Sequence, residues 1–174
     1  MAHINTVETM LARQDIRDCI MRYARGIDRG DLELLLSCYW EDAHEVHGPA
    51  YNGPVVPYLK GAVARMQAQR PVMQHFIGNV HVELDGDRAR VESYILTFAR
   101  FAKDGQDYDT LTGARAHDRF ERRGGEWRIA HRQAVFDWNS DRPSAETWCL
   151  GLFDTEHPDM VMGDKAPADL TYRR

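Results

Sequence analysis

The chain has 174 residues, of which 43% are hydrophobic, and its formal net charge at pH 7 is -5. This length suits one domain with its own core, and no apolar run approaches the roughly 20 residues that cross a bilayer, so we expect no membrane association. The negative charge, without a basic stripe, argues against a nucleic-acid partner. Scattered cysteines without a C-x-x-C pair, and an N-terminus without a secretory signal, predict a cytoplasmic protein.

The first part of the chain has the features of helices. Asn5 or Thr6 can cap a short opening helix, and Gly30 suits the end of a long one. Asp31 can cap the helix after that. The predicted elements, in order, are helices 7–12, 14–29 and 32–40, a strand over 43–47, a turn at Asn52-Gly53-Pro54 and a helix over 55–69.

The pattern then changes to the period of two that is typical of strands. Strands are predicted over 73–84, 88–102, 111–122 and 127–138, with turns rich in glycine between them. In the first of these, alternation places His75 and Phe76 on opposite faces. We expect Phe76, Phe98, Phe136, Trp138 and Trp40 to line the core or a pocket.

These elements predict an α+β fold in which N-terminal helices pack in the concave face of one curved antiparallel sheet. Residues 1–140 form this domain in our interpretation. Residues 141–174, with three prolines and little periodicity, are predicted to be an arm or a tail that closes a pocket.

The end of the long helix carries a carboxylate in an unfavourable place. Asp28 borders an apolar stripe and faces the negative end of the helix dipole, so it needs a partner. The stripe consists of Ile16, Cys19, Ile20, Tyr23, Ala24 and Ile27. His75 is one candidate partner, since a carboxylate against an imidazole makes a general base near neutral pH, and Arg25, Arg29 or solvent are the alternatives. Tyr23 can then donate a hydrogen bond to developing negative charge.

Other histidines have a different interpretation. His44-Glu45-Val46-His47 has a superficial likeness to a zinc motif, but histidines three apart on a strand face opposite sides, so we predict no metal there. His117 and His131 are expected on the outside or at an interface. We also predict no cofactor, since glycine-rich nucleotide motifs are absent.

Several motifs together resemble one family. The segments I-D-R-G-D-L, W-E-D-A, Q-H-F-I-G-N and H-D-R-F-E-R-R-G-G-E-W-R-I-A-H-R, with the ending A-P-A-D-L-T-Y-R-R, resemble the SnoaL-like branch of the nuclear transport factor 2-like superfamily. That cone-shaped fold includes scytalone dehydratase, bile-acid dehydratase, ketosteroid isomerase and hexachlorocyclohexane dehydrochlorinase. The resemblance implies the fold more strongly than the substrate.

The resemblance implies roles for four residues. Asp28 and His75 match the catalytic Asp–His dyad of the dehydratases and the dehydrochlorinase. Tyr23 matches a tyrosine of the bile-acid dehydratase, where the dehydrochlorinase has a lysine. Arg132 lies five residues after Trp127 and matches a functional arginine on the last strand.

We therefore expect a cofactor-independent lyase of the dehydratase type that acts on a small hydrophobic, cyclic substrate. Two alternatives remain open. The same dyad serves an isomerase, or the chain is a non-catalytic subunit similar to the β subunit of a ring-hydroxylating dioxygenase. The relatives imply a homotrimer or a homodimer.

Overall fold

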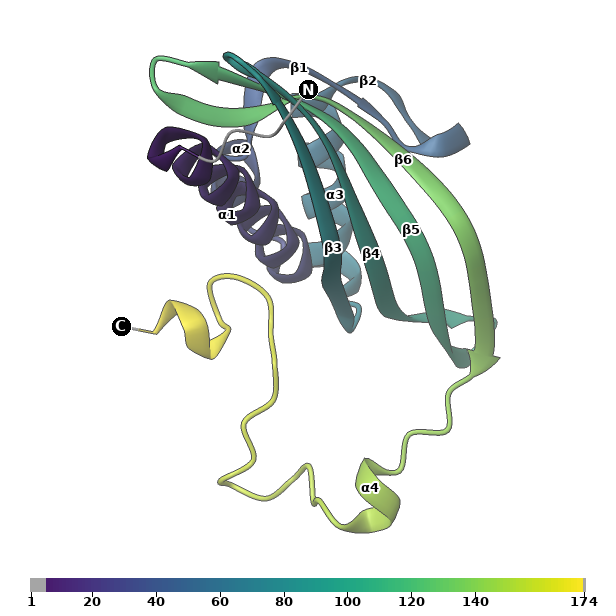
Figure 1. Cartoon of the computed structure of the whole chain (residues 1–174). Coiled ribbons are helices and arrows are strands. Elements are labelled where there is room, and N and C mark those ends of the chain that lie inside the picture. Colours follow the sequence, from purple (N-terminus) through teal and green to yellow (C-terminus); the bar gives the residue numbers. More distant parts are fainter. Residues whose placement is uncertain (1–5, 174) are drawn as a thin grey trace.

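Three helices lie inside the curve of a six-stranded sheet (Figure 1). The structure is a computed structural model and describes residues 6–173. The strands follow the order β2-β1-β6-β5-β4-β3, and only the β1–β6 pair among these described strands is parallel. The predicted α+β architecture is confirmed. No helix within residues 6–173 is long and apolar enough to cross a lipid bilayer.

The N-terminal helix α1 is longer than predicted and runs without interruption from Val7 to Arg29. Thr6 caps it and forms a capping box with Thr9, while Gly30 adopts the left-handed conformation that ends it. The prediction of two separate helices was wrong, because no glycine or proline interrupts the chain between them. The alternative cap, Asn5, lies outside the described residues, as does the segment in which we looked for a secretory signal.

A short helix and two short strands follow α1. Helix α2 spans Leu32–Leu36, β1 spans Tyr39–Val46 and β2 spans Asn52–Pro54. The helix predicted over 32–40 ends early because Tyr39 already pairs with Ile129 of the last strand. The turn predicted at Asn52-Gly53-Pro54 is instead the β2 strand, which pairs antiparallel with β1. A single 3-10 turn, η1 (Gly48–Ala50), connects them.

Helix α3 spans Val55–Gln69, as predicted, and leads into four long strands. These are β3 (Met73–Asp85), β4 (Arg88–Lys103), β5 (Gln106–Arg123) and β6 (Glu126–Pro143). They form successive hairpins, with shifts in register between β3 and β4 and between β5 and β6. Such bulges bend long strands, which explains the curvature of the sheet.

A bulge in β3 overturns part of the predicted alternation. The register shifts between Ile77 and Val80, so the residues before and after the bulge exchange faces. As a result, Ile77, Val80 and Val82 all pack toward the core. Phe76 is 70% exposed on the outer face, and its predicted place in the core was wrong.

The core lies between α1, α3 and the inner face of the sheet. The whole predicted stripe of α1 is buried, and it packs against strand residues such as Val91 and Phe120. Helix α2 approaches α1 closely because Gly26 has no side chain. A Cβ added to Gly26 would lie 2.9 Å from Cγ of Leu35, which is fully buried. Gly26 therefore sets how the end of α1, and with it Asp28, meets the rest of the fold.

We predict that Gly26→Ala destabilises the fold although alanine is the better helix former. Overpacking against Leu35 should outweigh the helix propensity and lower the free energy of unfolding by about 1–2 kcal/mol. The control is Gly61→Ala in α3, where the added Cβ would meet only the end of Arg65 at 3.6 Å. That variant should gain about 0.5–1 kcal/mol. Urea unfolding compares the two, and an unchanged or higher stability of Gly26→Ala would contradict this account of the α1–α2 contact.

Candidate functional site

The Asp28 carboxylate at the end of α1 contacts His75 at the start of β3. Nδ1 of His75 lies 2.6 Å from Oδ1 of Asp28, and the backbone N–H of His75 donates to both carboxylate oxygens at 3.1 and 3.0 Å. The side chain of His75 is 16% exposed and that of Asp28 is 13% exposed. With Nδ1 held by the carboxylate, Nε2 is the free ring nitrogen, and no residue within 6–173 hydrogen-bonds to it. This arrangement suits a general base.

The C-terminal segment supports the backbone at Asp28. The ammonium group of Lys165 donates to the carbonyl oxygen of Asp28 at 2.7 Å, where the end of α1 leaves carbonyls without partners in the helix. Lys165 is only 5% exposed, and burial lowers its pKa. Its positive charge lies at the negative end of the helix dipole and beside a carboxylate. The unfavourable position of Asp28 is therefore compensated from two sides, by β3 and by the tail.

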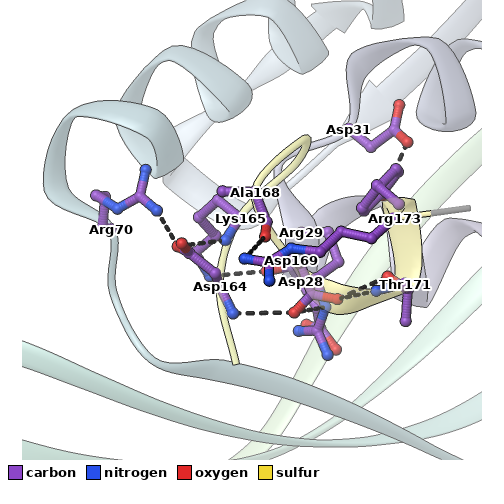
Figure 2. Close-up of polar contacts among 11 residues, drawn as sticks. Asp28, Arg29, Asp31, Arg70, Asp164, Lys165, Ala168, Asp169, Thr171 and Arg173 are labelled. Carbon is purple, nitrogen blue, oxygen red and sulfur yellow. Dashed lines mark hydrogen bonds and ion pairs between the residues drawn. The ribbon is translucent and has the colours of Figure 1, made fainter. Parts of the chain in front are cut away.

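Figure 2 shows how the segment 164–173 is fixed to the end of α1. The backbone N–H of Ala166 donates to the carbonyl of Arg29 at 2.8 Å, and Arg29 also pairs with Asp169 at 3.4 Å. Asp164 pairs with Arg70 at the end of α3. Before this segment, the chain leaves β6, forms the short helix α4 (Trp148–Gly151) and returns to the end of α1 (Figure 1). A last 3-10 turn, η2, spans Leu170–Tyr172.

The two other predicted site residues, Tyr23 and Arg132, stack on each other in the core. The guanidinium carbon of Arg132 lies 4.1 Å from the ring centroid of Tyr23. Arg132 is fixed in the strand β6 by Asp118 of β5 through two hydrogen bonds of 2.7 Å. Its Nη1 is buried without a hydrogen-bond partner among the described residues. Burial raises the pKa of Tyr23 to about 12, so its hydroxyl keeps its proton near neutral pH.

Two adjoining cavities, of about 240 and 280 Å³, meet at Tyr23 and His75. Both are also lined by His47 and Met73. The first opens over the inner face of the sheet, with mostly apolar walls that include Ile95, Ala99, Phe101, Ala116, Ala134 and Phe136, and Arg132 lies in its wall. The second lies between α1 and α3 and is lined by Ile27, Tyr51, Tyr58, Ala62, Arg65 and Met66, among others. The Asp28–His75 pair therefore borders a largely apolar space.

The structure adds two residues that sequence reasoning missed as parts of this site. His47 lines both cavities, and Glu45, two residues earlier in the chain, is fully buried. His44, in contrast, stacks on His131 and contacts Asn52, so the two histidines of the motif do face different surroundings, as predicted. The sequence signal for Glu45 was its position in the predicted strand, two residues after Ala43. Residues two apart in a strand lie on the same face, and Ala43 and Glu45 are both buried.

Only some of the aromatic side chains that were predicted to line the core or a pocket do so. Phe136 lines the first cavity although it is half exposed, and Trp40 packs at the edge of the core. Trp138 is half exposed and covers Gly113 on the outer face. Among the described side chains, no cluster of three or more His, Cys, Asp or Glu residues has the spacing to hold a metal ion.

A curved sheet around N-terminal helices is the arrangement of a cystatin-like fold. Within that class, the chain belongs to the SnoaL-like family, because the profile of the SnoaL-like domain matches residues 8–133. A comparison with curated proteins gives no match.

Solved structures share this fold at low sequence identity. A candidate scytalone dehydratase from Novosphingobium aromaticivorans is 18% identical, with a TM-score of 0.68 over 77% of this chain and 89% of that one. Hexachlorocyclohexane dehydrochlorinase LinA-type3 from Novosphingobium barchaimii is 19% identical, with a TM-score of 0.69 over 80% and 94%. A candidate aromatic ring hydroxylase from Novosphingobium aromaticivorans is 20% identical, with a TM-score of 0.62 over 76% and 92%. The fold is thus shared by proteins with different activities.

We predict that the buried pair of Asp118 and Arg132 is essential for stability. Asp118→Ala removes both acceptors that hold the buried guanidinium of Arg132 and should lower the free energy of unfolding by about 3–5 kcal/mol. The matched control is Asp137→Ala, which breaks a bidentate pair of similar geometry with Arg115, but on the surface. Water replaces that partner, so little stability should be lost. Equal losses in thermal or urea unfolding would show that burial does not govern these pairs.

Proposed function

We propose that the protein is a cofactor-independent lyase that removes a proton from carbon and expels a leaving group from the neighbouring position. The observation that carries this proposal is the 2.6 Å contact between Asp28 and His75 at the wall of an apolar cavity. The carboxylate keeps the proton on Nδ1, so Nε2 is available to accept a proton from carbon. A non-catalytic subunit has no need of such a pair beside a cavity.

Tyr23 and Arg132 place a hydroxyl donor and a positive charge at the wall of the first cavity. When a proton leaves carbon next to a carbonyl group, negative charge develops on the carbonyl oxygen. The Tyr23 hydroxyl remains a donor up to a pH near its pKa of about 12, and the Arg132 guanidinium that covers the Tyr23 ring has an Nη1 without a partner among the described residues. In an apolar environment these few donors act more strongly than in water.

The cavities indicate the size of the substrate. Each is slightly smaller than the pockets of about 300 Å³ and above that hold drug-sized ligands. A single six-membered ring suits one of them, and two or three fused rings would extend through both, past Tyr23 and His75. We therefore propose a compact, hydrophobic, cyclic substrate with a carbonyl group and a leaving group β to it.

The test uses cyclic β-hydroxy ketones, beginning with 3-hydroxycyclohexanone, with cyclohexenone formation followed by absorbance and by mass. His75→Ala should reduce turnover by about 10²–10⁴-fold, because the base is lost. The control is His81→Ala on the same strand, whose side chain is 67% exposed and pairs only loosely with Glu83. Elimination removes one water from the substrate mass, whereas an isomerase leaves the mass unchanged. Full turnover by His75→Ala would refute the mechanism.

We also propose that the protein is a homo-oligomer through the outer face of its sheet. Phe76, Leu96 and Trp138 lie in one row across the strands, joined by the register partner Gly113, and all three side chains are exposed. A row of large apolar side chains on a sheet face is typical of an interface. The arm over residues 144–163 adds the exposed Leu150.

Charges introduced into this row should dissociate the oligomer. Phe76→Glu with Leu96→Glu is expected to give a monomer by multi-angle light scattering, since burying a carboxylate against apolar surface is costly. Arg90→Glu, exposed on β4 away from the row, should leave the molar mass unchanged. A wild-type protein that is monomeric at high concentration would refute the proposed interface.

A further inference from the structure

A second carboxylate–histidine pair borders the same cavities on the side of β1. Nδ1 of His47 lies 3.1 Å from the Tyr58 hydroxyl and 3.5 Å from Oε1 of Glu45. The His47 ring also packs edge-on against Phe136. Its Nδ1 is thus occupied by Tyr58 and Glu45, and no described residue hydrogen-bonds to its Nε2.

The carboxylate of Glu45 lacks a full set of partners. Glu45 is fully buried, and its Oε2 accepts a hydrogen bond from the Tyr39 hydroxyl at 3.1 Å. Its Oε1 is buried without a hydrogen-bond partner within residues 6–173. The nearby group that can supply a proton to this oxygen is the Nδ1 of His47, and a buried carboxylate oxygen left without a donor is costly.

The buried charges around Glu45 do not balance. Glu45 pairs in register with Arg132 across the β1–β6 contact, but the guanidinium is already bound to Asp118. This buried group therefore contains two carboxylates and one guanidinium, an excess of one negative charge. Burial raises the pKa of Asp118, and repulsion from Glu45 adds to that effect. His47 faces this group of side chains through its Nδ1.

We propose that His47, supported by the buried Glu45 carboxylate, is the general acid that protonates the departing oxygen of the substrate. This inference rests on the proposed elimination at His75. In that reaction His75 Nε2 takes the proton, the C–H electron pair forms the new C=C bond, and the C–O bond breaks with its electron pair on oxygen. That oxygen takes the proton from Nε2 of His47 and leaves as water. A proton then returns from His75 to His47 through solvent.

The two histidines have different surroundings, which separates their tasks. His75 is held by one close carboxylate at the end of a helix, whereas His47 adjoins a carboxylate in a buried cluster of excess negative charge. Different environments for two titratable groups are how one site supplies both an acid and a base. The other titratable groups that line these cavities are Tyr23 of α1, Tyr51, Tyr58 and Arg65 on the α3 side, and Arg115 and Arg132 of the sheet.

The kinetic test compares two probes that give the same product. 3-Hydroxycyclohexanone and 3-acetoxycyclohexanone both yield cyclohexenone, but acetate leaves without a proton whereas hydroxide does not. His47→Gln should slow the loss of water by about 10²–10⁴-fold and change the loss of acetate only a few-fold. His75→Ala should slow both. The control is His44→Gln, outside the cavities, which should slow neither.

The outcomes separate the two proposals. If His47→Gln slows neither reaction, or slows both equally, while His75→Ala slows both, the role of His47 is refuted and the elimination at His75 stands. If His75→Ala slows neither reaction, the proposed function itself fails. A His47→Gln variant that loses acetate at nearly the wild-type rate but loses water slowly is a result that a merely structural role would not produce.

A second measurement needs no turnover. Side-chain nitrogen NMR shows which ring nitrogen of His47 carries the proton in the wild-type protein and in Glu45→Gln. Nδ1 should carry it in the wild-type protein, because that nitrogen faces the Glu45 carboxylate. The same share of this tautomer in Glu45→Gln would refute the pairing, whether or not the ketones are substrates.

Discussion

The rest of the site depends on the compensation of one carboxylate at the wrong end of a helix. Asp28 faces the negative end of α1, and it is stable there because His75 gives it both a side-chain and a main-chain N–H. One residue of β3 thereby ties the end of the helix to the start of a strand. The contact fixes the imidazole orientation and also the separation of α1 from the sheet, so the geometry of the pair and the shape of the cavity are not independent.

A second set of polar side chains in the core likewise fixes its own members in place. Arg132 binds Asp118 through two nitrogens and covers the ring of Tyr23, so a charged residue, a carboxylate and a tyrosine position one another. Buried charges of this kind add little net stability compared with apolar residues, yet removing one partner is costly. Their value lies in fixed orientation, which a cavity with few polar groups needs for its chemistry.

Sequence reasoning predicted the parts of this structure that periodicity controls. The stripe of α1, the helix after Pro54 and the long hairpins follow from spacing alone. The unfavourable position of Asp28 indicated that it needs a partner, and the family resemblance implied that the partner is His75. Events of tertiary structure were not predictable. The bulge in β3 turned Phe76 outward, and strand pairing at Tyr39 shortened α2. The burial of Glu45 depends on Arg132 being its neighbour across a parallel strand pair, which joins residues far apart in the chain.

The attachment of Lys165 to the backbone of Asp28 also has a consequence for a chain that ends early. Every strand and helix that frames the cavities precedes residue 144, so none of these elements includes a residue of the arm. The segment that supports the carbonyl of Asp28 comes last. A chain that ends within the arm would hold its curved sheet and the imidazole of His75, but it would fold with an unsupported helix end.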